Sequence, residues 1–230
     1  MPGHDVTCEE QEVRNLSELV SHIEKLHEGH FWYRGQGSHH HRLIPSIGRT
    51  IATRSSSGLM NLDEILELEE RLINRFGQRS LPYWPHGFPQ SAWEKLFTMQ
   101  HYGLPTRLLD WSTNVLMAAS FAAMHRQCQF CREEGMKDSC RPTIWILQPR
   151  EFNSKIGRLD GTNGTILSTT DQFIDSWSPG APKTRMSPTP VALFGSHNND
   201  RIVAQSGNFV VLEKSLIPWT QLIRSETERL

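Results

Sequence analysis

One segment, from Thr98 to Ala123 (TMQHYGLPTRLLDWSTNVLMAASFAA), constrains the fold of this 230-residue chain most. Gly103 offers the left-handed conformation that ends a helix, and Pro105 prevents the helix from resuming. The pattern predicts a helix end, a rigid turn, a short strand and a new helix in immediate succession. Such tight alternation leaves little freedom in how these elements pack.

Two charged residues in this segment flank an apolar pair. Arg107 and Asp110 bracket Leu108 and Leu109, which a strand would bury. A buried charge is costly unless it is paired. We therefore expect both charges to be buried and hydrogen-bonded, to each other or to nearby backbone. A polar group held inside a core is typical of a binding or catalytic site.

Composition and charge exclude several classes of protein. Hydrophobic residues make up 37% and charged residues 21% of the chain, which suits one domain over residues 1–230. The formal net charge of -1 argues against a broad nucleic-acid surface or an electrostatic grip on membranes. The N-terminus is polar and acidic, and four cysteines suit a reducing compartment. These features predict a cytoplasmic protein without a membrane span.

Capping residues mark four expected helices. The first runs from Asn15 to His27, the second from Asn61 to Gly77, and the third begins at Ser91, where Glu94 completes a capping box. The fourth begins near Asn114 and carries small residues that allow close packing, namely Ala118, Ala119, Ala122 and Ala123.

Short strands are expected between and after these helices. They cover residues 30–37, 143–147, 201–204 and 208–212. Residues 36–60 read as a long loop with an exposed histidine triplet, and residues 157–200 give weak signals. Helices concentrated early with dispersed strands predict a single α+β domain, with helices packed on a mixed or antiparallel sheet.

Three polar positions are the first candidates for chemistry. Arg34 ends the aromatic strand next to glycines, where its guanidinium could hold a phosphate or carboxylate; the alternative is a surface arginine. Ser112 and Thr113 lie where a strand turns into a helix, and could instead be ordinary helix caps. Gln205 could project from a strand into a cleft, or simply be solvated.

Three segments resemble the FRG domain family, which is named for its Phe/Arg/Gly signature. They are FWYRGQ, MQHYGLPTRLLDWSTNVLMAASFA and RIVAQSGNF, in this order and spacing. Polar residues embedded in three apolar segments need shared partners, so we expect Arg34, Asp110 and Gln205 to converge around one cleft. The predicted ligand-binding residues are Tyr33, Arg34, Gly35, Gln36, Gln100, His101, Tyr102, Thr106, Arg107 and Asp110.

A weaker likeness links the same motifs to ADP-ribosyltransferases. That family uses an aromatic-Arg-Gly strand to hold NAD, then a Ser/Thr motif, then a glutamate on a later strand. The likeness implies that Arg34 binds the pyrophosphate and that Ser112, Thr113 and Gln205 form the catalytic group. Gln205 departs from the family, because it is neutral where a carboxylate is expected.

A cysteine-bearing insertion is expected at about residues 126–141. Its spacing, H-x2-C-x2-C-x8-C, could supply four zinc ligands from His125, Cys128, Cys131 and Cys140. Free thiols are the alternative, since the second half of the pattern is irregular.

The sequence thus predicts recognition of a phosphate-bearing small ligand, such as the nucleotide NAD, with ADP-ribosyl transfer or NAD cleavage as the enzymatic version. The alternative is a non-catalytic interaction module with a protein partner. In that case Arg107 and Asp110 form a buried structural pair, and Gln100 and Gln205 satisfy backbone groups.

Overall fold

The computed structural model describes residues 10–26, 29–52, 62–83, 89, 91–124, 141–156, 159, 164–182, 184–187, 189–195 and 207–211. Its centre is a five-stranded sheet with the order β3-β1-β2-β5-β4, in which every neighbouring pair is antiparallel. The strands are β1 (Trp32–Gln36), β2 (Leu108–Ser112), β3 (Thr143–Leu147), β4 (Val191–Phe194) and β5 (Gly207–Val211). Together with the helices, this sheet confirms the predicted α+β class.

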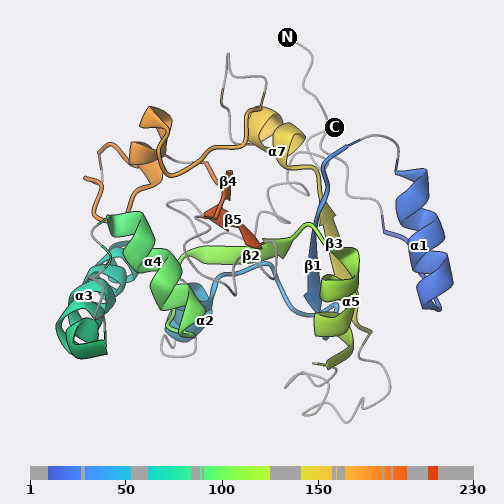
Figure 1. Ribbon diagram of the computed structural model, residues 1–230, viewed down its shortest axis with the longest axis horizontal. Helices are drawn as coiled ribbons and strands as arrows, with labels where there is room; N and C mark the ends of the chain where they lie inside the picture. The colour runs from blue at the N-terminus through green and yellow to red at the C-terminus, as the bar shows by residue number, and fades with distance from the viewer. Residues whose placement is uncertain are drawn as a thin grey trace.

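The sheet is narrowest between β1 and β2. These strands share one registered pair, Tyr33 opposite Ser112, whereas β1 and β3 stay in register from Trp32 to Gln36. In Figure 1, β1 stands upright while β2 runs across the view. We call this junction the seam. It joins a two-stranded part, β3-β1, to a three-stranded part, β2-β5-β4.

Helices surround the sheet, and two of them start at the caps predicted at Asn15 and Ser91. Asn15 accepts a hydrogen bond from the Glu18 amide at 2.9 Å, and the Ser91–Glu94 capping box is complete. Gly103, with φ 74°, provides the predicted left-handed stop. The helices are α1 (Leu16–Lys25), α2 (Ser46–Ala52), α3 (Leu62–Ser80), α4 (Ala92–His101), α5 (Val115–Met124) and α7 (Pro149–Lys155), with 3-10 turns η1 (Leu81–Tyr83) and η2 (Gln172–Trp177).

The small residues of α5 let this helix press on β1, as expected. A Cβ atom added to Gly35 would lie 1.8 Å from the Ala118 carbonyl oxygen, so only glycine fits there. Ala118 and Ala122 are both buried. Figure 1 shows α5 lying over β1 and β3. The contact places the N-terminal end of α5 beside the seam.

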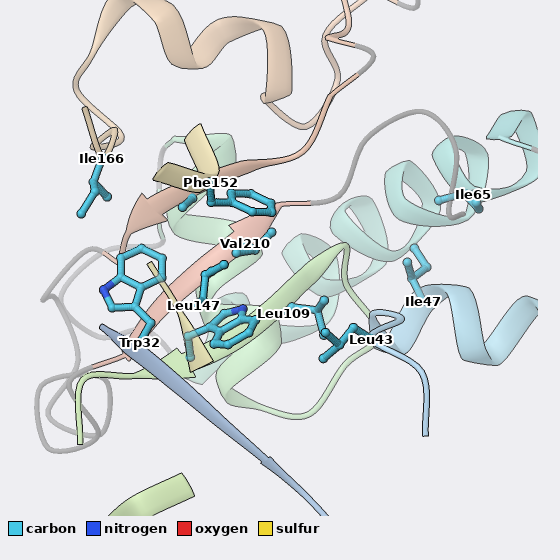
Figure 2. Close-up of a cluster of buried hydrophobic side chains, with 11 residues drawn as sticks. Trp32, Leu43, Ile47, Ile65, Leu109, Leu147, Phe152, Ile166 and Val210 are labelled. Carbon is cyan, nitrogen blue, oxygen red and sulfur yellow. The ribbon is translucent and has the colours of Figure 1, made fainter. Parts of the chain in front are cut away.

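Two apolar clusters cover opposite faces of the sheet. Figure 2 shows the first, in which Trp32 and Leu147 meet Leu109 and Val210 across the seam. The second packs Leu108 of β2 against α4 and β4. Because side chains alternate along β2, Asp110 shares the α4 face with Leu108. The face that carries Asp110 is therefore the one on which α4 lies.

One sequence prediction is wrong in part, and three short elements were not predicted. The expected loop at residues 36–60 contains α2, whose Ile47 is fully buried and donates its amide to the Thr106 carbonyl at 3.2 Å. Residues 157–200 contain η2 and β4, and α7 was not predicted. Such short elements depend on tertiary packing more than on local propensity, so the sequence marks them weakly.

Other predictions fall outside the described residues, including the strand at 201–204 and all but the last residue of the insertion expected at about 126–141. In the described part of the chain, no helix is long and apolar enough to cross a membrane.

Candidate functional site

A cleft of about 280 Å³ opens beside the seam, between α4 and α5. It is lined by residues from β1, α4, β2, α5 and β5, which are far apart in the sequence. These residues are Tyr33, Arg34, Gly35, Phe97, Gln100, His101, Asp110, Trp111, Ser112, Met117, Ala118, Phe121 and Phe209. Seven of them, Tyr33, Arg34, Gly35, Gln100, His101, Asp110 and Ser112, are among the predicted site residues.

Arg34 crosses the seam. Its Nη1 donates to the backbone carbonyl oxygen of Asp110 at 2.8 Å and lies 3.8 Å from the Asp110 carboxylate. The side chain is only 17% exposed, and its Nε has no hydrogen-bond partner among the described residues. Burial lowers the pKa of Arg34, Asp110 raises it and Arg49 lowers it again. An arginine nonetheless stays charged, so a positive group with unused donor capacity lies at the cleft wall.

Asp110 is exposed, contrary to the expectation that it would be buried. Its side chain is 55% exposed, because the alternation of β2 turns it to the side where the cleft opens. Gln100 on α4 donates from Nε2 to Asp110 Oδ2 at 2.7 Å. The carboxylate is thus oriented, but it remains accessible from the cleft.

Thr106 sits behind this contact and is fully buried. Its hydroxyl donates to Gln100 Oε1 and accepts from the Leu108 amide at 3.2 Å. Its backbone amide donates to Ser46 Oγ at 3.0 Å. Thr106 therefore connects α2, the start of β2 and the Gln100 side chain, without reaching the cleft itself.

Three further predicted ligand-binding residues lie away from the cleft. Arg107 is buried and donates from Nε to both carboxylate oxygens of Glu69, at 2.8 and 3.0 Å. Its position beside Leu108 and Leu109 had suggested Asp110 as a partner, but Arg107 pairs with Glu69 of α3 instead. Gln36 is buried and accepts from Trp145 Nε1 at 2.7 Å. Tyr102 is 62% exposed at the end of α4.

The three predicted catalytic residues have different fates. Ser112 lines the cleft, and its Oγ also accepts from the Asn114 amide at 3.0 Å at the start of α5, which is the capping role considered above. Thr113 is exposed and does not line the cleft. Gln205 lies outside the described residues.

The predicted zinc ligands His125, Cys128, Cys131 and Cys140 also lie outside the described residues, so zinc binding stays a prediction. Among the residues that are described, no group of three or more His, Cys, Asp or Glu could hold a metal ion.

The sequence analysis did not predict the aromatic residues of the site or Arg49. Phe97 and Phe209 stack with ring centroids 4.8 Å apart, and Phe121 of α5 also lines the cleft. Their apolar character alone indicates a core position. Arg49 on α2 lowers the pKa of Arg34. The pKa of Arg49 is itself lowered by burial, and Asp110 raises it by a smaller amount. Only a correct prediction of α2 could have brought Arg49 to the seam.

A larger hollow of about 490 Å³ runs along α1 and is lined only by residues between 11 and 25. All its walls come from one helix and the segment before it, so no second element faces a ligand there.

Comparison with known proteins gives one match. The model of the FRG domain family matches residues 29–129, which run from just before β1 to beyond α5. No curated protein and no solved structure matches the chain. All the residues that line the cleft, apart from Phe209, lie inside the matched segment.

Proposed function

The chain contains an FRG domain, and we propose that the cleft of this domain binds a phosphate-bearing small ligand, a nucleotide such as NAD. The observation that carries the proposal is Arg34, a mostly buried guanidinium at the cleft wall whose Nε has no partner among the described residues. A buried polar group without a partner is uncommon and calls for an explanation, and a ligand held against this guanidinium would supply one.

The charge around the seam favours an anion. Arg49 lowers the pKa of Arg34, and Asp110 is the carboxylate that raises the pKa of both arginines. One negative charge does not balance two positive ones. Planar guanidinium groups suit phosphate oxygens because they can donate two parallel hydrogen bonds.

The remaining walls favour a ring. Phe97, Phe121 and Phe209 supply aromatic surface, and Met117 adds a polarizable apolar contact. The volume of about 280 Å³ lies near the lower end of small-molecule pockets, roughly 300–1,000 Å³. A cleft of this size suits one nucleotide, which would be one half of a dinucleotide such as NAD.

The enzymatic version of the proposal is ADP-ribosyl transfer or NAD cleavage. The bond between ribose C1′ and the nicotinamide nitrogen would break, nicotinamide would leave with the bonding electrons, and a nucleophile or water would add to C1′. Ser112 lines the cleft and would order the ribose. Gln205 completes the proposed catalytic group, and Thr113, which does not line the cleft, is left out of it.

Binding is tested with NAD, AMP and nicotinamide mononucleotide, by thermal shift and then by calorimetry, since a bound ligand raises apparent stability. Arg34→Lys should weaken binding about ten- to a hundredfold, because lysine keeps the charge but loses the two-pronged geometry. Arg79→Lys, at an exposed arginine of α3, is the matched control and should bind as the wild type does.

Nicotinamide release, followed by chromatography, tests the enzymatic version. Gln205→Glu should leave affinity nearly unchanged and raise NAD turnover, since a carboxylate would stabilise the positive charge that develops on the ribose. Folded protein that binds none of the three compounds contradicts the proposal.

That outcome would favour the alternative, an interaction module. This alternative is supported by hydrogen bonds inside the protein, which the side chains of Gln36, Thr106 and Arg107 all make. In that function these motif residues hold the core, and the cleft takes no small ligand.

A further inference from the structure

We propose that Asp110 makes the cleft selective for ligands that bring a hydroxyl or amino donor close to their phosphate, and that Thr106 fixes this preference through Gln100. The inference rests on the proposed function and deepens it. It predicts the ligand class more narrowly, as a nucleoside phosphate with its ribose hydroxyls intact.

The first step concerns the two carboxylate oxygens of Asp110. Gln100 Nε2 donates to Oδ2 at 2.7 Å, and the contact of Arg34 Nη1, at 3.8 Å, is also with Oδ2. Within the described residues, no contact engages Oδ1, although the side chain lines the cleft and is 55% exposed. An ionised carboxylate only accepts hydrogen bonds. A ligand beside Arg34 therefore meets an open acceptor.

The second step concerns the orientation of the Gln100 amide, which Thr106 determines. The Thr106 hydroxyl already accepts from the Leu108 amide, and its hydrogen is directed to Gln100 Oε1. A flipped Gln100 would place its carbonyl oxygen against the Asp110 carboxylate, which is repulsive. One amide hydrogen of Gln100 is thus held on Asp110 Oδ2, and the Oδ1 of this carboxylate is the acceptor that the wall offers to the ligand.

The third step combines the two neighbours. Arg34 offers donors to a phosphate, and the Asp110 carboxylate, whose Oδ2 lies 3.8 Å from Arg34 Nη1, offers its Oδ1 as an acceptor beside it. A bare phosphate would satisfy the first and be repelled by the second. A nucleotide satisfies both, because ribose hydroxyls follow its phosphate at short range.

Calorimetry with matched ligands tests this selectivity. The probes are AMP and nicotinamide mononucleotide, each compared with its 2′,3′-dideoxy counterpart. The wild type should bind the dideoxy compound about ten- to a hundredfold more weakly, since a hydrogen bond to a charged group is lost. In Asp110→Ala the two compounds should bind equally, within about threefold.

Asp110→Ala leaves the Arg34 anchor in place, because Arg34 donates to the backbone carbonyl of residue 110. Equal binding of both compounds by the wild type overturns the selectivity alone. Persistent discrimination in Asp110→Ala overturns the role of Asp110. If neither mononucleotide binds, the proposed function and this inference fail together.

The role of Thr106 has its own readout, the side-chain amide resonances of Gln100. Thr106→Val removes the hydroxyl at nearly constant volume, so these resonances should move and the discrimination should fall. Thr106→Ser keeps the hydroxyl and should preserve both. Gln100→Met removes the amide and leaves the residue at position 106 unchanged. It should also lose the discrimination, and it replaces the valine variant in the test if that variant does not fold. Unchanged discrimination in both the valine and the methionine variants overturns the positioning role.

Discussion

At the scale of single residues, the seam concentrates positive charge. Arg49 lowers the pKa of His41, in the histidine triplet after β1, as well as that of Arg34. Burial lowers the pKa of His41 from its ordinary 6.5, and Arg49 and His40 lower it further. The folded protein therefore resists protonation of this imidazole, although His41 lies on an exposed loop as predicted.

His41 should make stability fall in mild acid. Above pH 6.5 the imidazole is neutral in the folded and the unfolded protein, so it does not change the free energy of unfolding. As the pH falls from 6.5 through the lower pKa of His41 in the folded protein, the unfolded chain binds more protons and stability decreases. His41→Gln should flatten this decline in the free energy of unfolding, measured by urea melts between about pH 7.5 and 5. His22→Gln, on α1 far from α2 in Figure 1, is the control for the substitution itself. Parallel curves for His41→Gln and wild type contradict the argument.

At the scale of elements, the closest packing in the site region is that of α5 on β1. The Ala118 carbonyl oxygen occupies the space that any side chain at position 35 would need. Backbone cannot move aside as a flexible side chain can. The spacing between α5 and β1, and with it one wall of the cleft, is set by this glycine.

Gly35→Ala should therefore destabilise the protein by about 1–3 kcal/mol or more, as overpacked cores do. Gly29→Ala is the matched control, since its added Cβ would meet only the side chains of Phe31, at 3.0 Å, and Gln148, at 3.3 Å. Urea unfolding of both variants decides the point. If both variants lost the same free energy of unfolding, α5 would be able to move away from β1 as easily as the side chains near Gly29 move.

These elements also show what the sequence could and could not predict. The cap at Asn15, the capping box at Ser91 and the stop at Gly103 are local, and all were predicted correctly. The short helix α2 depends on burying Ile47 against distant strands, which no local pattern records. The same holds within the site. Arg34 was found because glycines mark its strand end, whereas Asp110 was placed in the core because the direction of the β2 alternation was unknown.

At the scale of the whole molecule, one buried ion pair ties the parts together. Arg107 at the start of β2 pairs with Glu69 of α3, and its Nη2 donates to the Trp177 carbonyl oxygen of η2 at 3.3 Å. The side chains are 1% and 3% exposed. Three segments separated widely in the sequence meet at this guanidinium, which explains its burial without any role in the cleft.

Breaking this pair should be costly, and replacing it should not be. Glu69→Gln should lower the free energy of unfolding by about 3–5 kcal/mol, because it leaves a buried charge uncompensated. The double variant Glu69→Leu/Arg107→Met should lose less than Glu69→Gln alone. Glu151→Gln, which breaks the exposed Lys155–Glu151 pair, is the control and should cost under about 1 kcal/mol. Urea melts measure all three, and a double variant as damaged as Glu69→Gln would show that the pair is needed for more than charge balance.

The strand order has a consequence for how the protein is made. β5, at residues 207–211, lies between β2 and β4 and pairs with both, although β2 ends at residue 112. During synthesis, the long edge of β2 must wait for nearly a hundred further residues before its partner leaves the ribosome. Unpaired strand edges attract other chains. The nascent protein therefore completes its sheet, and the aromatic wall that Phe209 gives to the cleft, only when this late strand inserts between two earlier ones.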